Sequence, residues 1–272
     1  MSTMSTKTTA ARAGIQAIDV GMQVLQVFRG RHRALPLHEI AVAVGASPSL
    51  MHRYLVSLCR AKMVEQEPGS GNYRLGPLAL HLGLQRLAAM DPLGVVEPLL
   101  RDLVALVDTT STLAVWGDGG PIVIRWEESS HLIGVKLRIG AALPLLTTAT
   151  GQVFAAWRPA AGIEPLLAAE AAAARRTGLG PGKLAEVRAL LDGVRRQGYA
   201  RVDGSTSPAI CGVSAPIFDH AGALVLALSS LGHQGQIDTG PDSALVKALC
   251  ATAAEASQRL GFDPPPQAHR RT

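Results

Sequence analysis

The sequence predicts an α+β fold with two domains, and three observations carry that prediction. Apolar residues recur at helical spacing up to Val107, hairpin patterns begin at Ser111, and helices and strands then mix without strict alternation. The 272 residues, 47% of them apolar, are enough to build two ordinary domains with real cores. Aromatic residues make up only 4% of the chain, so we expect these cores to be aliphatic.

The first 76 residues show the element order of a winged helix-turn-helix. Helical patterns cover 15–28 and 37–44, the second stopping at Gly45, and a third helix begins with Ser47 as N-cap and Pro48 in its first turn. Short alternating runs at 64–67 and 73–75 flank a Pro- and Gly-rich turn, which predicts a β-hairpin. Three helices followed by a hairpin indicate a DNA-binding head.

The rest of the chain predicts a mixed domain preceded by a connecting helix. We expect helices over 77–89, 93–107, 147–157, 183–197 and 243–260, hairpins over 112–126 and 213–228, and a strand over 132–139. The helix over 77–89 carries leucines on more than one face, so we expect it to pack against two partners.

Positive charge is concentrated at the N-terminus. Residues 1–62 contain eight basic and two acidic residues, a net charge of +6, whereas the other 210 residues contain 18 basic and 19 acidic, a net charge of −1. This asymmetry favours a nucleic-acid-binding module joined to a neutral body.

The third helix has two distinct faces when its residues are placed at 100° intervals. The predicted core face consists of Leu50, Tyr54, Leu55, Leu58 and Ala61. The opposite face carries Ser49, His52, Arg53, Val56 and Arg60, with Ser47 at the helix start. Taken alone, such a face is often only the solvated side of a helix.

The charge asymmetry and the hairpin favour DNA contact instead. Arg53 is the first candidate for a base or phosphate contact, with Ser47, Ser49 and His52 beside it, and we expect Arg60 to reach a backbone phosphate. Asn72 and Arg74 would contact DNA from the hairpin, and Lys7 and Arg12 from a flexible arm.

Several function classes are excluded. No apolar run reaches the roughly 18–20 residues that span a bilayer, and the N-terminus lacks the apolar core of a secretory signal, so we expect a cytoplasmic protein. Cys59, Cys211 and Cys250 fit neither a disulfide framework nor a metal knuckle, and we expect Cys211 to be a buried, inert thiol.

No catalytic motif is found either. The segment 178–183 lacks the hydroxyl of a P-loop, and 212–216 lacks the second glycine of a nucleophile elbow. Glu127 and Glu128 would face opposite sides of a strand. We therefore expect no enzyme, no cofactor and no metal.

At the level of families, the chain resembles the IclR-type transcriptional regulators. The matching stretches are 14–28, 35–76, 147–157, 195–200 and 212–232, with a final helix ending in Leu260-Gly261, and they follow family order over about residues 14–262. The most specific part of this resemblance is the helix-turn-helix segment followed by the Tyr-Arg-Leu-Gly strand of the wing.

The resemblance implies a division into five parts and a set of partners. The parts are a flexible arm (1–13), a winged helix-turn-helix domain (14–76), a linker helix (77–91), a GAF-like α/β effector-binding domain (92–262) and a tail (263–272). The implied partners are a partly palindromic double-stranded DNA operator, a small organic acid of a class that includes aromatic acids, and further copies in a homodimer or homotetramer.

The resemblance also implies an effector pocket, and the residues make chemical sense of it. Ala149, Thr150 and Gly151 begin a helix, whose unpaired amides suit a carboxylate, and Ser229 adds a hydroxyl at a strand end. Leu132, Val135 and Leu143 match the family's apolar wall.

This sequence departs from the family at two positions. Gln152 stands where the family usually has Lys, and Gly212 stands where some members have a polar side chain. Gly212 enlarges the pocket, which favours a ligand larger than a two- or three-carbon acid.

Alternatives remain for the second domain. Residues 147–151 could be an ordinary helix cap beside a tightly packed glycine, and the domain could serve only oligomerisation or, remotely, turn over its ligand. Trp116 and Trp126 are expected in the core or an interface, or else lining the pocket.

Overall fold

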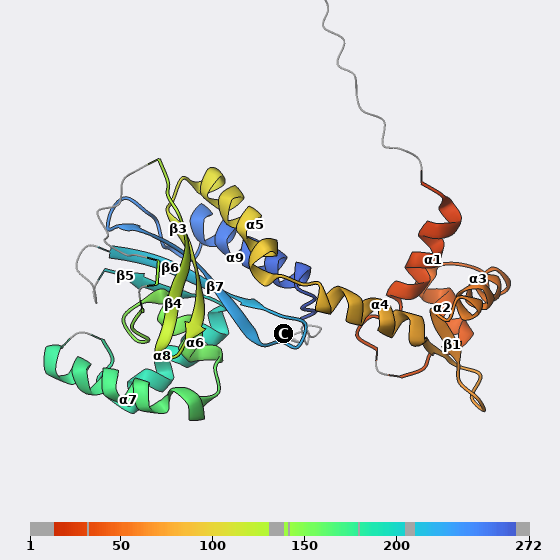
Figure 1. The fold of residues 1–272 in the computed structure, drawn as a ribbon, viewed down its shortest axis with the longest axis horizontal. Coiled ribbons are helices and arrows are strands. Elements are labelled where there is room, and N and C mark those ends of the chain that lie inside the picture. The colour runs from red at the N-terminus through yellow and green to blue at the C-terminus, as the bar shows by residue number, and fades with distance from the viewer. Residues whose placement is uncertain are drawn as a thin grey trace, which may run out of the picture. The chain divides into compact units, whose positions relative to one another are not determined.

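The computed structural model describes residues 14–31, 33–130, 139–140, 142–178, 180–204 and 210–264. The chain forms two compact units that divide between Met90 and Asp91 (Figure 1). The predicted arm (1–13), most of the predicted strand over 132–139 and most of the predicted tail lie outside the described residues. The α+β fold class is confirmed by the elements of both units.

The first unit is a helix-turn-helix with a two-stranded wing. Its elements are α1 (Gln16–Gln26), α2 (Leu37–Val44), α3 (Pro48–Arg60), β1 (Val64–Gln66), β2 (Tyr73–Leu75) and α4 (Pro77–Ala88). Gly45 ends α2 with a φ of +72°, a left-handed conformation that glycine adopts without strain. The Ser47 hydroxyl accepts a hydrogen bond from the Leu50 amide at 3.3 Å and caps α3, as the sequence predicts.

The core of this unit joins its helices to the wing. Val24, Ile40, Met51 and Leu55 are fully buried and pack in one cluster with Leu35 and Tyr73. The backbone amides of Leu35 and Tyr73 each donate to the other residue's carbonyl at 2.8 Å. The wing strand β2 is therefore hydrogen-bonded to the segment before α2. Because Leu35 and Tyr73 also pack in the cluster that contains Met51 and Leu55, the base of the wing is held against α3.

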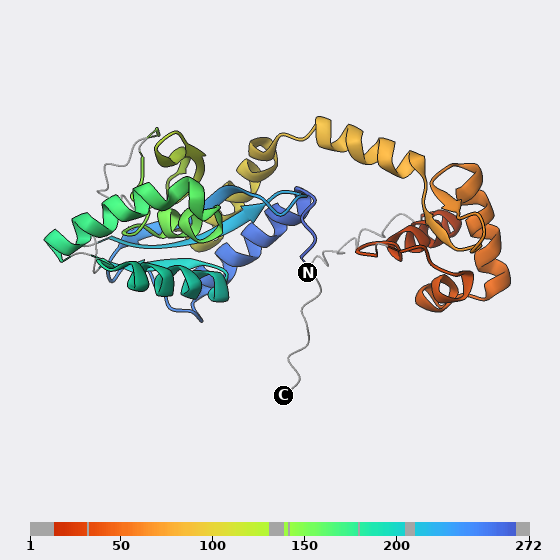
Figure 2. The ribbon, with the colours of Figure 1, turned by 90° about the horizontal axis from the view of Figure 1, so that it is seen from below.

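The helix α4, visible along its length in Figure 2, has no buried residue. Leu80, Leu82 and Leu84 expose between 51% and 62% of their surface. The two-sided packing predicted from its leucines is therefore not provided by the described residues of one chain.

The second unit is a five-stranded antiparallel sheet with helices on both sides, and the strand order is β4-β3-β7-β6-β5. The strands are β3 (Ser111–Gly117), β4 (Gly120–Glu127), β5 (Ala200–Asp203), β6 (Ile210–Phe218) and β7 (Leu224–His233). The helices are α5 (Pro92–Val107), α6 (Ala149–Trp157), α7 (Ala160–Thr177), α8 (Leu184–Gln197) and α9 (Ala244–Arg259). Figure 1 shows α5 and α9 on one side of the sheet and α6, α7 and α8 on the other.

Two elements of this unit are absent from the sequence prediction. The helix α7 has 18 residues and is rich in alanine, so it lacks a clear apolar stripe. The strand β5 has only four residues and no run of β-branched side chains. None of the helices within the described ranges combines the length and apolarity needed to cross a bilayer.

Candidate DNA interface and effector pocket

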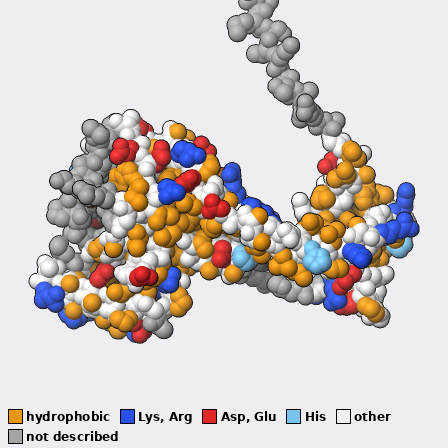
Figure 3. All heavy atoms as spheres, viewed as in Figure 1, with side chains coloured by type: hydrophobic (Ala, Val, Ile, Leu, Met, Phe, Trp, Pro, Cys, Tyr) orange, Lys and Arg blue, Asp and Glu red, His pale blue; other side chains and the backbone are white. Residues whose placement is uncertain are grey.

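The face of α3 that the sequence assigns to DNA is exposed. Ser49, His52, Arg53 and Arg60 are all exposed, and Val56 is half-buried. Within the part of the chain that the structure describes, neither Arg53 nor Arg60 forms an ion pair. An open hollow of about 580 Å³ runs beside this face and is lined by Ala17, Leu50, His52, Arg53, Tyr54, Val56, Ser57 and Arg60. Figure 3 shows basic and histidine side chains on the surface of this unit.

The core face of α3 differs from the prediction. Met51 and Leu55 are completely buried, whereas Leu50 is 41% exposed and Ala61 is exposed. The predicted assignment of Leu50 and Ala61 to the core is wrong. The helix turns Met51 toward Val24 and Ile40 because α1 and α2 meet on that side, and a helical wheel cannot show where neighbouring helices lie.

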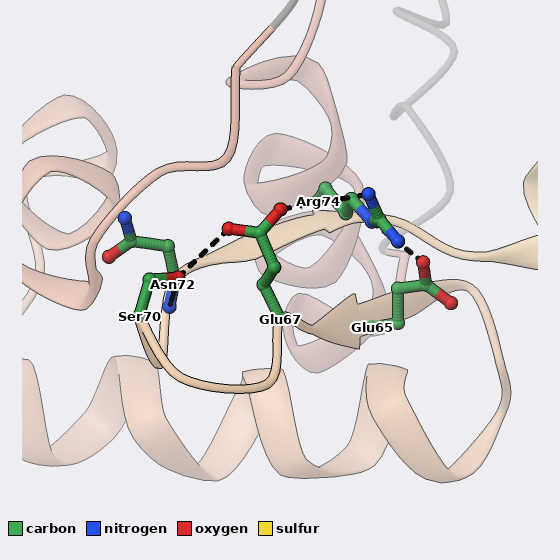
Figure 4. Close-up of polar contacts among 5 residues, drawn as sticks. All are labelled: Glu65, Glu67, Ser70, Asn72 and Arg74. Carbon is green, nitrogen blue, oxygen red and sulfur yellow. Dashed lines mark hydrogen bonds and ion pairs between the residues drawn. The ribbon is translucent and has the colours of Figure 1, made fainter.

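The wing differs from α3 because its arginine is paired. Arg74 Nε lies 2.7 Å from Glu65 Oε1, and Arg74 Nη1 lies 3.6 Å from Glu67 Oε1 (Figure 4). The β1–β2 register places Glu65 directly opposite Arg74. Glu67 also accepts a hydrogen bond from the Ser70 hydroxyl at 2.9 Å, and the Asn72 amide donates to that hydroxyl at 3.2 Å. Arg74, a predicted DNA contact, is thus held between two carboxylates.

A second basic group borders the wing. Arg33 donates to Glu39 at 2.6 Å, and Arg31 lies 3.9 Å from the same carboxylate. The hydrogen bond from Arg33 lowers the pKa of Glu39 below its usual value. Arg31, Arg33 and Arg74 line an open cleft of about 680 Å³ together with Glu67 and Asn72. Each arginine in this cleft has an acidic partner.

The second unit contains a cavity where the sequence predicts the effector pocket. Its volume is about 150 Å³, and it lies between the sheet and the start of α6. The described lining residues are Thr112, Leu143, Thr147, Thr148, Ala149, Thr150, Val202, Ile210, Cys211, Gly212, Val213, Ser229, Ser230 and Leu231. The structure therefore brings together the predicted residues Leu143, Ala149, Thr150, Gly212 and Ser229. Leu132 and Val135 lie outside the described residues.

Gly151 lies beside this cavity but does not line it. A Cβ atom at this position would lie 2.0 Å from the Pro144 carbonyl oxygen and 2.6 Å from the Leu145 Cα. The backbone before α6 crosses directly over the helix here, so only glycine fits. Gly151 is a packing glycine, the alternative that the sequence left open.

Hydroxyl groups form the polar wall of the cavity. The Thr150 and Ser229 hydroxyls lie 2.7 Å apart, and Ser229 donates to the Ser214 hydroxyl at 2.8 Å. The Thr148 hydroxyl caps α6 by accepting from the Gly151 amide at 2.9 Å. Within the described residues, the amides of Ala149 and Thr150 have no hydrogen-bond acceptor. The helix start therefore offers two donors and a partial positive charge to a bound group.

The described lining contains no charged side chain. Burial raises the pKa of the Cys211 thiol above its usual value, so the thiol stays protonated near neutral pH, as expected for an inert cysteine. Trp116 is not among the described lining residues of the cavity. Its ring packs against Phe154 at a tilt of 51° with centroids 5.9 Å apart, and the Arg158 guanidinium carbon lies 4.3 Å from its centroid. Trp126 also lies outside the lining.

Comparison with known proteins identifies the family. The model described as the IclR helix-turn-helix domain matches residues 17–68, and the model described as the bacterial transcriptional regulator IclR C-terminal domain matches residues 85–258. The chain belongs to the IclR family. The family resemblance stated from the sequence is confirmed.

Relatives of similar length support the same assignment. The glycerol operon regulatory protein of Streptomyces griseus is 30% identical over 91% of this chain and 97% of its own length. The HTH-type transcriptional regulator XynR of Escherichia coli is 26% identical over 91% of this chain and 98% of its own length. The structure of Pseudomonas aeruginosa HmgR superposes with a TM-score of 0.83 at 31% identity, over 92% of this chain and 100% of that one.

These relatives make this IclR-family chain a DNA-binding transcriptional regulator, and not an enzyme, as the sequence predicts. Sequence reasoning missed several lining residues, among them Thr112, Ser230 and Leu231. It also missed Glu170 of α7. Its carboxylate accepts hydrogen bonds from the Leu145 and Leu146 amides. Nothing in a single sequence marks a glutamate in an alanine-rich helix as a partner of a distant loop.

Proposed function

We propose that this regulator binds a partly palindromic operator through α3 and that a small carboxylic acid in the second unit controls the binding. The pocket is the observation that carries the proposal: Ala149 and Thr150, whose amides have no acceptor within the described residues, line a cavity whose described lining contains hydroxyls and no charged side chain. A carboxylate there would accept hydrogen bonds from the helix start and meet its partial positive charge. The Ser229 hydroxyl has a single proton, so it would donate to the carboxylate in place of its hydrogen bond to Ser214.

The size of the cavity favours a ligand with a single ring. An apolar cavity of about 150 Å³ holds a benzene molecule in another protein, and this cavity has the same volume, about 150 Å³. Gly212 lines this space, and a Cβ atom there would lie 3.3 Å from the Ser230 carbonyl oxygen and 3.8 Å from the side chains of Val202 and Leu231, which also line it. We therefore place an aromatic or similarly compact acid ahead of a two-carbon acid.

A polyol is the second candidate. The hydroxyls of Thr112, Thr150 and Ser229 could pair with the alcohols of a neutral ligand. The Streptomyces griseus relative is named for a glycerol operon. Glycerol therefore belongs in any ligand screen of this protein.

Apolar side chains on the first unit support a homodimer or homotetramer. Ile15, Ile18 and Met22 of the first helical segment are 52% to 66% exposed, and α4 is lined with exposed leucines. Burying such surfaces against a second copy would be favourable. The ligand would then act by binding one arrangement of the copies better than another, which shifts the population that fits the operator.

A thermal-shift screen with benzoate, phenylacetate, acetate and glycerol tests the ligand class. A true ligand at 100 times its Kd stabilises the protein by about 2.7 kcal/mol. We expect benzoate to raise the midpoint more than acetate does, and Ser229→Ala to weaken that response about three- to tenfold. Ser257→Ala is the matched control, because Ser257 is a buried serine of α9 whose hydroxyl bonds to the Ala253 carbonyl and the Phe218 amide, and it does not line the described cavity.

Mobility-shift titrations on a duplex selected from a random library then test the coupling. The acid that stabilises the protein should change the apparent operator affinity by at least about fivefold. Stabilisation without any change in affinity would leave the second unit as an oligomerisation module. Conversion of the acid to a product would instead favour the enzyme alternative.

A further inference from the structure

The segment that leads into α6, residues 143–148 (the pocket loop), is held largely by side chains. Glu170 Oε1 accepts from the Leu145 amide at 2.7 Å, and Glu170 Oε2 accepts from the Leu146 amide at 2.8 Å. The Gln152 side-chain amide donates to the Leu146 carbonyl at 3.0 Å. Both backbone polar groups of Leu146 are therefore satisfied by side chains, as buried groups require.

The pocket loop forms one wall of the cavity. Leu143, Thr147 and Thr148 line the pocket, while Leu145 and Leu146 are each 1% exposed and point into the core. The loop lies directly on the first turn of α6, where Gly151 makes room for Pro144. The Thr148 hydroxyl donates to the Pro144 carbonyl at 2.7 Å and ties the loop to the helix cap. A displacement of the loop would move this wall and the helix start together.

Glu170 is the strongest of these anchors. Among the residues that the structure describes, it alone accepts from two loop amides, and hydrogen bonds to a carboxylate are stronger than those to a neutral acceptor. Gln152 makes one hydrogen bond to the loop, and its buried Oε1 has no partner within the described residues. Glu170 belongs to α7, and no described residue of α7 lines the cavity. The shape of the pocket wall thus depends on a helix outside the pocket.

We propose that Glu170 is a positioning residue of the effector pocket, which holds the pocket loop and the first turn of α6 in the geometry that receives the ligand. This inference rests on the proposed function of the cavity. A consequence is that α7 communicates with the pocket: any partner or substitution that shifts α7 alters the ligand site without touching it.

Hydrogen exchange of the unmodified full chain provides the first test. We expect the Leu145 and Leu146 amides to be protected like amides in regular structure, although they belong to a loop. Exchange at the rate of an unprotected loop would show that Glu170 does not hold them, and would overturn the proposal without any substitution.

Glu170→Gln provides the second test, because an amide keeps only one acceptor oxygen and turns its NH₂ group toward a backbone donor. We expect the Leu145 and Leu146 amides to exchange about tenfold faster in this variant. The amides of β6 and β7 should keep their wild-type rates. Glu164→Gln is the matched control, since Glu164 is an exposed glutamate of the same helix that makes no hydrogen bond within the described residues.

Ligand binding separates a positioning role from a merely stabilising one. We expect Glu170→Gln to weaken benzoate binding about fivefold or more, while its affinity for the selected duplex without benzoate stays within about twofold of wild type. Unchanged benzoate affinity together with faster loop exchange would overturn the positioning role. If benzoate fails to bind the wild type, the proposed ligand class is wrong, and the exchange of Thr147 to Thr150 in Glu170→Gln decides the present inference alone.

Discussion

The exposed face of α3 and the wing were both predicted to touch DNA, and they present their arginines differently. Arg53 and Arg60 of α3 form no ion pair within the described residues, whereas Arg74 of the wing is bound by Glu65 and Glu67. Glu65, Glu67 and Arg74 together carry a net charge of −1. Two arginines that the sequence assigns to DNA contact can therefore differ in their role. We expect the attraction of DNA phosphates to come mainly from the arginines of α3.

The largest expected effect is on the stability of the first unit, because the buried side of α3 determines which side of the helix is exposed. Met51→Ala should destabilise the first unit by about 2–5 kcal/mol, because it removes a fully buried side chain and leaves a cavity. Leu50→Ala, one residue earlier, should cost no more than about 0.5 kcal/mol. Urea unfolding followed by circular dichroism measures both, and similar losses would show that Leu50 is buried after all.

The next effect is on DNA affinity. Arg53→Ala should weaken binding to the selected duplex by about 1–3 kcal/mol, the range typical of a good base contact. Arg188→Ala in α8 is the control, because it removes the same charge from the other unit. Mobility-shift titrations at several salt concentrations measure the loss. If Arg53→Ala left the DNA affinity unchanged, the claim that α3 contributes more to DNA binding than the wing would be wrong.

A smaller effect of opposite sign is expected at the wing. Glu67→Gln should tighten DNA binding about two- to fivefold, because it removes one negative charge near the phosphates and loosens the hold on Arg74. Ser70→Ala is a useful control, since it removes the hydrogen bond to Glu67 and keeps the charge. Weaker binding by Glu67→Gln would mean that the carboxylate itself contributes to the DNA contact.

The smallest effect tests Arg74 directly. In the wild-type background, Arg74→Ala should weaken DNA binding by about twofold or less, because the arginine is already paired. In a Glu65→Gln, Glu67→Gln background the same substitution should cost about fivefold, and this difference is the coupling that a double-mutant cycle measures. If Arg74→Ala in the wild-type background reduced DNA affinity as much as Arg53→Ala does, the wing arginine and the α3 arginine would contribute equally, and the proposed difference between them would be wrong.

Local chemistry explains what could be predicted. Gly45, Ser47 and Pro48 predict the turn and the start of α3 because each acts on the backbone within a few residues of itself. The hairpins of the second unit were also predictable, although β6 and β7 extend beyond the expected 213–228. Most of the pocket residues that the family resemblance implies line one cavity. The exceptions are Gly151, which lies beside the cavity, and Leu132 and Val135, which lie outside the described residues.

Long-range contacts explain what could not be predicted. Leu50 and Met51 are adjacent apolar residues, and only the position of α1 and α2 decides which of them is buried. The pairing of Arg74 with Glu67 depends on the conformation of the turn between β1 and β2. Glu170 is 24 and 25 residues away in the sequence from the two loop residues whose amides it binds. Such contacts depend on how elements pack.

By itself, the sequence determined the order of the elements, the concentration of positive charge in the head and the membership of a regulator family. These follow from composition, periodicity and capping, which act locally or on the chain as a whole. Only the tertiary structure decided which described arginines of the head pair with carboxylates, why residue 151 is glycine and which side chain accepts from the amides of the pocket loop. Those outcomes depend on distances between side chains that are remote in sequence, and packing alone sets such distances.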